Sequence, residues 1–161
     1  MAFRVGIITI SDTASRGQRE DLSGAAIREL VAAVGGEIIG YAIVPDERDQ
    51  IASAIVTQVD DAGAEVVLTT GGTGLSPRDV TPEATATVID YEAPGIAEAM
   101  RAEGLKHTRR AMLSRARAGV RGRSLVVNLP GSPKGVRESL GAILDVLPHA
   151  VEILRSRPTD H

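Results

Sequence analysis

The chain has 161 residues, of which 43% are apolar and only 2% aromatic, and its formal net charge is −3. This length and composition predict a single domain over residues 1–161 with an aliphatic core. The absence of cysteine excludes disulfides and zinc–thiolate sites, and the scarcity of aromatic residues argues against nucleic acid as a partner. The N-terminal apolar run (5–10) is too short for a signal peptide or membrane span, so we expect a cytoplasmic protein without a membrane partner.

The pattern of apolar residues predicts alternating strands and helices. Near-continuous β-branched runs indicate buried strands, and apolar residues at helical spacing indicate helices. In chain order these are a strand (3–10), a helix (22–34), a strand (37–44), a helix (47–61), a strand (65–70), three helical segments (82–90, 96–102 and 109–118), a strand (124–129) and two helices (134–146 and 148–155), followed by a polar tail. We therefore expect an α/β fold of three layers, a mainly parallel sheet with helices on both faces.

Polar or glycine-rich loops follow four of the predicted strands. They contain Ser11 and Asp12, then Asp46, then residues 71–79, and finally residues 128–132. Because ligands bind beyond the carboxyl ends of the strands in open parallel sheets, we expect the four loops to form one site.

The segment Gly71-Gly72-Thr73-Gly74 directly follows a predicted strand. It is not a P-loop, since no Lys-Ser/Thr pair follows at the required spacing, and Pro77 stands where a dinucleotide fingerprint has glycine or alanine. Two interpretations remain: a tight turn between strand and helix, or a nest of backbone N–H groups that binds phosphate.

Two aspartates lie in these loops, and each has two interpretations. Asp46 and Asp79 precede predicted helices and are candidates for helix capping. They are also candidate ligands of Mg²⁺, which often uses one or two carboxylates together with substrate phosphates. In the same region, Thr81-Pro82 has the pattern of a capping hydroxyl followed by a proline in the first helical turn.

Two further features also have alternative interpretations. Asn128 suits recognition of the edge of a heterocycle, or fixes the loop that follows it. Between residues 101 and 123, the only acid is Glu103, and this basic stretch is either a solvated helix face or a wall beside a phosphate-bearing ligand. Its candidates for phosphate neutralisation are Arg109, Arg110, Arg115 and Arg117.

These motifs together resemble a known family. The segments Ile10-Ser11-Asp12-Thr13, Pro45-Asp46-Glu47, residues 69–85, Leu113-Ser114-Arg115 and Asn128-Leu129-Pro130-Gly131-Ser132-Pro133 resemble those of MogA/MoaB-type molybdenum cofactor biosynthesis proteins, which include the G domains of gephyrin and of the plant Cnx proteins. The resemblance covers nearly the whole chain and implies the molybdopterin-binding fold.

The resemblance also implies an activity, which is adenylyl transfer from Mg²⁺-bound ATP to molybdopterin with release of pyrophosphate. It implies a homotrimer or a hexamer of trimers, and contact with other cofactor-synthesis proteins. Asp46 and Asp79 would be the catalytic and metal-binding pair, and the residues implied to bind nucleotide or pterin are Ser11, Asp12, Gly71, Gly72, Thr73, Gly74, Ser76, Ser114, Asn128, Pro130, Gly131 and Ser132.

Two alternatives to this enzyme remain at the level of sequence. One is a non-catalytic carrier of molybdopterin of the MoaB type. The other is a nucleotide-binding module with a different substrate.

Overall fold

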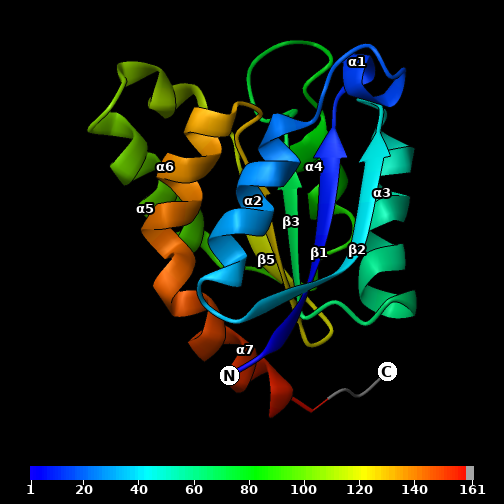
Figure 1. Cartoon of the computed structure of the whole chain (residues 1–161), viewed down its shortest axis with the longest axis vertical. Helices are drawn as coiled ribbons and strands as arrows, with labels where there is room; N and C mark the ends of the chain where they lie inside the picture. The colour runs from blue at the N-terminus through cyan, green and yellow to red at the C-terminus, as the bar shows by residue number, and fades with distance from the viewer. Residues whose placement is uncertain (159–161) are drawn as a thin grey trace.

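The computed structural model describes residues 1–158, with a six-stranded sheet at its centre (Figure 1). In chain order the strands are β1 (Phe3–Ile10), β2 (Gly36–Val44), β3 (Val66–Thr70), β4 (Tyr91–Glu92), β5 (Ala118–Arg121) and β6 (Ser124–Leu129). Their order across the sheet is β2-β1-β3-β6-β5-β4. β1 pairs in parallel with β2 and β3, and β3 with β6, while β5 pairs antiparallel with β6 and β4. The expected mainly parallel sheet is confirmed.

Helices cover both faces of this sheet, as predicted (Figure 1). They are α1 (Asp12–Ser15), α2 (Leu22–Ala32), α3 (Arg48–Val56), α4 (Thr81–Ala86), α5 (Pro94–Leu105), α6 (Pro133–Ile143) and α7 (Leu147–Arg155). α3 continues into a π-helical turn (Thr57–Asp61), and 3-10 turns occupy Arg109–Leu113 and Leu144–Val146. The helix ends thus differ from the predicted ones by a few residues.

The core consists of two apolar layers, one on each face of the sheet. One layer contains Phe3, Val5 and Ile7 of β1 together with side chains of α2, α5, α6 and α7. The other contains Ile8 and Ile10 of β1 together with side chains of α3 and α4. Because both faces of β1 are buried, its sequence is a continuous apolar run rather than an alternating one.

The prediction of a helix over residues 109–118 was wrong. Only Arg109–Leu113 is helical, as a 3-10 turn, and Ala118 already begins β5. Alanine and glycine are poor strand formers, so Ala118 and Gly119 gave no strand signal. Gly119 is required there because a Cβ at this position would lie 2.5 Å from Cδ1 of Ile89 and 2.6 Å from the carbonyl oxygen of Tyr91. The short strands β4 and β5 therefore depend on a close approach that the local sequence does not reveal.

No helix within residues 1–158 is long and apolar enough to cross a membrane. The polar tail predicted after residue 155 is described only as far as Pro158, and its last three residues lie outside the described part of the chain.

Candidate active site

The four polar loops meet at the carboxyl ends of the parallel strands, as predicted. Figure 1 shows that β1, β2 and β3 point toward the same edge of the sheet, where α1 and the long loop before α4 lie. A cavity of about 400 Å³ opens there, which we call the aspartate cavity. The predicted site residues that line it are Ser11, Asp46, Gly71, Gly72, Asp79, Gly131 and Ser132.

A second cavity, of about 340 Å³, lies beside the first, and we call it the Ser114 cavity. Ser132 lines both cavities. The other predicted residues that line the Ser114 cavity are Thr73, Gly74, Ser114 and Pro130. Arg110 and Lys134 bring positive charge to its wall, and Glu138 brings one negative charge. Most of the predicted site is thus divided between two neighbouring cavities, whereas Asp12, Ser76 and Asn128 line neither of them.

The glycines between β3 and α4 make a turn that no larger residue would allow. Gly71 has a φ of 106°, and a Cβ there would lie 2.2 Å from the carbonyl oxygen of Ile10. Gly72 has a φ of 70°, and its Cβ would lie 2.3 Å from the Thr81 hydroxyl. Within residues 1–158, the N–H groups of Gly72, Thr73 and Gly74 donate to no protein acceptor. The tight turn therefore also leaves backbone donors for a ligand.

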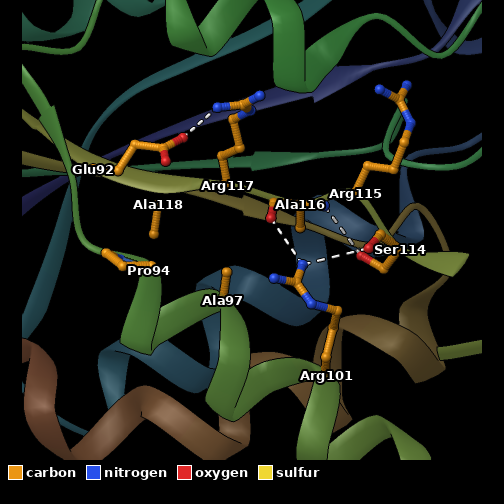
Figure 2. A pocket seen from close by; sticks show the side chains of 9 residues that line it. All are labelled: Glu92, Pro94, Ala97, Arg101, Ser114, Arg115, Ala116, Arg117 and Ala118. Carbon is orange, nitrogen blue, oxygen red and sulfur yellow. Dashed lines mark hydrogen bonds and ion pairs between the residues drawn. The ribbon is translucent and has the colours of Figure 1, made fainter. Parts of the chain in front are cut away.

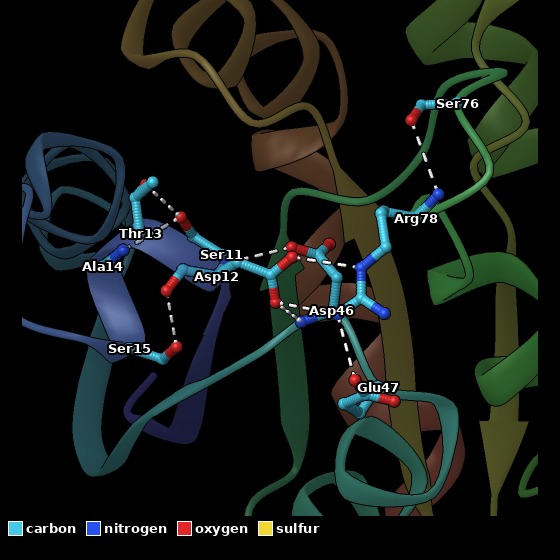
Figure 3. A network of polar contacts seen from close by, with 9 residues as sticks. All are labelled: Ser11, Asp12, Thr13, Ala14, Ser15, Asp46, Glu47, Ser76 and Arg78. Carbon is cyan, nitrogen blue, oxygen red and sulfur yellow. Dashed lines mark hydrogen bonds and ion pairs between the residues drawn. The ribbon is translucent and has the colours of Figure 1, made fainter.

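Asp46 is held at the end of β2 by a reciprocal pair of hydrogen bonds with Asp12 (Figure 3). The N–H of Asp12 donates to Oδ2 of Asp46, and the N–H of Asp46 donates to Oδ1 of Asp12, both at 3.0 Å. Asp46 does not cap α3, because the N-cap residue is Glu47 and no side chain caps that helix. The capping interpretation of Asp46 is therefore wrong.

Arg78 neutralises Asp12 rather than Asp46 (Figure 3). Its Nε and Nη2 donate to the two carboxylate oxygens of Asp12 at 3.1 and 3.0 Å, and Nη2 also donates to Glu47 at 3.0 Å. The bonds from Arg78 lower the pKa of Asp12. In contrast, burial raises the pKa of Asp46, and the negative charges of Asp12 and Asp79 add to that rise.

Asp79 lies in the glycine loop, in the turn before α4. Its Oδ2 accepts the N–H of Ser76 at 3.0 Å. A Cβ on Gly74 would lie only 2.9 Å from this oxygen, so the glycine permits the carboxylate to approach the loop backbone. α4 begins at Thr81, its N-cap residue is Val80, and no side chain caps it. Neither Asp79 nor Thr81 therefore has the predicted capping role.

Thr81 instead holds the base of the glycine loop. Its hydroxyl donates to the carbonyl oxygen of Gly71 at 2.9 Å, and its N–H donates to the carbonyl oxygen of Gly72 at 3.1 Å. Pro82 occupies the first turn of α4, as predicted.

The donor set of the aspartate cavity fits a magnesium ion that arrives with a phosphate ligand. Oδ1 of Asp46 and Oδ1 of Asp79 have no hydrogen-bond partner within residues 1–158. Over the same residues, no group of three or more His, Cys, Asp or Glu side chains is arranged to hold a metal. Two carboxylates without a third protein ligand suit Mg²⁺, which keeps waters and shares substrate phosphates.

Several other predicted site residues shape the loops from within. The Ser11 hydroxyl caps α1 by accepting the N–H of Ala14 at 3.2 Å, and the Ser132 hydroxyl caps α6 by accepting the N–H of Gly135 at 3.0 Å. Pro130 and Gly131 each accept a hydroxyl through their carbonyl oxygens, from Thr70 at 2.6 Å and Ser23 at 2.7 Å. These bonds fix the loop after β6 against β3 and α2.

Asn128 lies in the protein interior, with an exposed fraction of 0%. Its Oδ1 accepts the N–H of Arg117 at 3.1 Å, and its Nδ2 donates to the hydroxyls of Thr69 and Thr85 at 3.0 and 2.9 Å. This arrangement favours the second interpretation of Asn128, a side chain that fixes the surrounding backbone.

The aspartate cavity is also lined by residues at the start of α2, which were not among the predicted site residues. Asp21 lines the cavity and caps α2 through the N–H of Gly24 at 2.9 Å, and it also accepts the hydroxyls of Thr9 and Tyr41. An aspartate directly before an apolar helical stripe is a capping signal, and that signal was available in the sequence.

Three arginines of the basic stretch, Arg101, Arg115 and Arg117, line a separate cavity of about 340 Å³ (Figure 2), and each of them also bonds within the protein. Arg115 belongs to the segment that leads into β5, and Arg101 reaches this segment from α5 and donates to the carbonyl oxygen of Ala116 at 3.0 Å. Arg117 pairs with Glu92, and Arg121 pairs with Asp60 at 2.7 Å. Of the four predicted candidates, only Arg110 lines the Ser114 cavity.

The fold and the cavity define an α/β domain whose candidate ligand site, at the carboxyl ends of the parallel strands, combines a glycine turn with two carboxylates. A family model described as a probable molybdopterin binding domain matches residues 6–149. The chain belongs to this family of molybdenum cofactor biosynthesis domains, of the MogA/MoaB type.

Curated relatives and solved structures agree with this assignment. The molybdopterin adenylyltransferase of Helicobacter pylori (strain J99) is 43% identical over 154 residues, which cover 94% of this chain and 88% of the relative. That of Escherichia coli (strain K12) is 40% identical and covers 89% of this chain and 74% of its own. The crystal structure of the molybdopterin biosynthesis enzyme MoaB from Thermus thermophilus has a TM-score of 0.91 and 52% identity, with 98% of this chain and 99% of that chain covered.

Proposed function

We propose that this protein is a molybdopterin adenylyltransferase, which transfers the adenylyl group of ATP to molybdopterin and releases pyrophosphate. The observation that carries the proposal is the meeting of Asp46 and Asp79 with the glycine turn in one cavity. The relatives named molybdopterin adenylyltransferase support it.

In this reaction a terminal phosphate oxygen of molybdopterin attacks the α-phosphorus of ATP. The bond from that phosphorus to the oxygen bridging the α- and β-phosphates breaks, and pyrophosphate leaves. Both reactants are anions, so catalysis rests on positioning and charge neutralisation. Mg²⁺ held by Asp46 and Asp79 would supply positive charge at the phosphates. The N–H groups of Gly72, Thr73 and Gly74 would bind phosphate oxygens.

We assign the nucleotide phosphates to the aspartate cavity and the pterin to the Ser114 cavity. The first cavity contains the carboxylates that a metal–phosphate complex requires. The second is lined by Leu113 and Ala111 beside Arg110 and Lys134, which suits a flat ring system with an anionic tail. Ser132 lines both cavities, so the reacting phosphates would meet next to it.

The proposal also includes an assembly and a location. A homotrimer, or a hexamer of trimers, would bury apolar side chains such as Ile39, Tyr41 and Ile43, which are 37–40% exposed along β2. The assembly would contact other cofactor-synthesis proteins in the cytoplasm. Light scattering coupled to size exclusion gives the mass, and a monomer at micromolar concentration would contradict this part of the proposal.

A turnover assay tests the activity. Protein with molybdopterin and Mg-ATP is expected to release pyrophosphate, and Asp79→Ala is expected to abolish release, because the variant removes a carboxylate from the phosphate site. Tight binding of molybdopterin without any pyrophosphate would instead identify a carrier. Calorimetry that shows nucleotide binding without pterin binding would identify a nucleotide-binding module. Either outcome would overturn the proposed activity.

A further inference from the structure

Arg115 makes three hydrogen bonds to the loop between β3 and α4 and a fourth to Glu83 in the first turn of α4. Its N–H donates to the carbonyl oxygen of Thr73 at 2.8 Å, and its Nε donates to that of Gly74 at 2.8 Å. Its Nη2 donates to the carbonyl oxygen of Asp79 at 2.7 Å, and its Nη1 donates to the Glu83 carboxylate at 2.7 Å. All three guanidinium nitrogens are thus bonded within the protein.

These bonds join the two limbs of the loop, which are the residues that follow β3 and the residues that lead into α4. They do so beside the proposed site. Thr73 and Gly74 belong to the limb that leaves β3, whereas Asp79 belongs to the limb that enters α4 and Glu83 lies in the first turn of that helix. Thr81 joins the same limbs lower down, at Gly71 and Gly72. The tip between the limbs, Leu75 to Arg78, is exposed. Arg115 therefore connects the two limbs from outside the loop, while Arg78 at the tip is tied separately to Asp12 and Glu47.

The backbone segment that carries Arg115 is itself held by hydrogen bonds. Figure 2 shows Arg101 reaching from α5 to the segment that carries Arg115, where it donates to the carbonyl oxygen of Ala116 at 3.0 Å. On the following residue, the N–H of Arg117 donates to the buried Asn128 at 3.1 Å. The backbone on the C-terminal side of Arg115 is thus tied to α5 and β6, so the point from which the Arg115 side chain leaves is fixed.

We propose that Arg115 is a positioning residue that sets the separation between the phosphate-binding N–H groups of the glycine turn and the carboxylate of Asp79. The inference rests on the proposed function of this site. The planar guanidinium fork bonds two carbonyl oxygens and a carboxylate in fixed directions. A lysine carries the same charge on one flexible ammonium and cannot reproduce that geometry.

The test compares Arg115→Ala, Arg115→Lys and a matched control, Arg121→Ala. Arg121 likewise bonds one carbonyl oxygen, that of Val88 at 2.9 Å, and one carboxylate, that of Asp60, and it lines neither of the two proposed cavities. Steady-state pyrophosphate release gives kcat and the KM for Mg-ATP. Hydrogen exchange over residues 71–83 reports the loop directly, without turnover.

We expect Arg115→Ala to lower kcat about 100-fold with a smaller change in KM, as a displacement of roughly 1 Å in a reacting group does. Arg115→Lys should lose nearly as much, and Arg121→Ala should keep the wild-type kcat. Exchange over residues 71–83 should rise in both Arg115 variants and not in the control. Guanidinium at about 20 mM, far below the denaturing range, should restore part of the activity and of the protection in Arg115→Ala.

The outcomes separate the inference from the proposed function. Wild-type exchange in both Arg115 variants would overturn the inference, whether or not the protein turns over. Full activity of Arg115→Lys would overturn it as well, because charge alone would then suffice. A wild-type protein without turnover contradicts only the proposed function, since the exchange data still decide whether Arg115 holds the loop. If Arg115→Ala does not fold, Arg115→Lys and Glu83→Gln, which weakens one of the four bonds, carry the same comparison.

Discussion

Carboxylates at the two ends of the sheet differ in how their charge is compensated, and their pKa values shift in opposite directions. At the amino end, Glu65 directly precedes β3, and its side chain is only 8% exposed. Arg155 donates to both of its oxygens, at 2.5 and 2.9 Å, and the N–H of Arg4 donates at 3.1 Å. These bonds lower the pKa of Glu65, mainly through Arg155. At the carboxyl end, burial and neighbouring acids raise the pKa of Asp46.

In our proposal, this difference separates a carboxylate that stabilises the fold from one that binds a metal–phosphate ligand. The charge of Glu65 is compensated by the protein itself, so the folded state favours the ionised form of this carboxyl group. The charge of Asp46 is compensated only in part, because Arg78 bonds to Asp12 and Glu47 instead. The missing positive charge is what a metal–phosphate complex would bring. We therefore expect substitutions at the two ends to affect activity and stability in opposite ways.

The largest expected effect is on activity at the carboxyl end. Asp46→Asn preserves the shape of the side chain but removes the charge that would bind Mg²⁺, so we expect the rate of pyrophosphate release to fall by about 100-fold or more. Excess Mg²⁺ should recover little of it. A rate within a few-fold of wild type would show that Asp46 is not a ligand in the reaction.

The sequence revealed the carboxyl end of the sheet better than the amino end, because the signals at the carboxyl end lie close together in the sequence. Asp46, Asp79 and the glycines lie in the loops that follow strands, so the strand pattern and the rule for parallel sheets were enough to bring them together. The partnership of Glu65 with Arg155 spans 90 positions, and that of Arg115 with Asp79 spans 36. Periodicity and capping rules act within a few residues and contain no information about such pairs.

Local signals also failed where two roles compete for one residue. The Thr81-Pro82 pattern correctly marked the start of α4, but the hydroxyl bonds to Gly71 rather than capping the helix. Asn128 follows the apolar residues of β6, where a polar residue is noticeable. Its amide nevertheless forms hydrogen bonds only with Thr69, Thr85 and Arg117 within residues 1–158. In both cases the residue was correctly singled out, and only the folded surroundings decided what it does.

At the amino end, we expect the effect to be on stability alone. Glu65→Gln removes the charge that faces Arg155 and should lower the free energy of unfolding by about 2 kcal/mol and Tm by roughly 4–8 °C, with kcat unchanged. A matched control is Glu29→Gln, because the Glu29 carboxylate is 68% exposed in its pair with Arg137 and should contribute little. Thermal unfolding followed by circular dichroism measures both. Equal shifts in the two variants would show that the position at the sheet end is irrelevant.

The pH dependence of this effect has a definite sign. The pKa of Glu65 is lower in the folded chain than its ordinary value of 4.5. Its contribution is therefore complete above the unfolded pKa and disappears as the pH falls through the folded one. Unfolding curves from pH 7 downward should converge for wild type and Glu65→Gln at acid pH. A gap that persists at pH 2 would have to come from packing rather than from charge.

The smallest expected effect is a gain in stability from the variant that loses activity. The pKa of Asp46 is higher in the folded chain than its ordinary value of 3.8, so the folded state retains the proton more tightly than the unfolded state. What Asp46 contributes is present below the unfolded pKa and is lost as the pH rises through the folded one, which leaves a charged Asp46 unfavourable at pH 7. Asp46→Asn should therefore raise Tm at pH 7 by about 1–2 °C without magnesium or nucleotide, and the gain should vanish near pH 3. A lower Tm at pH 7 would mean that the hydrogen bond from Asp12 to the Asp46 carboxylate outweighs burial and repulsion. The charged Asp46 would then not lower the free energy of unfolding.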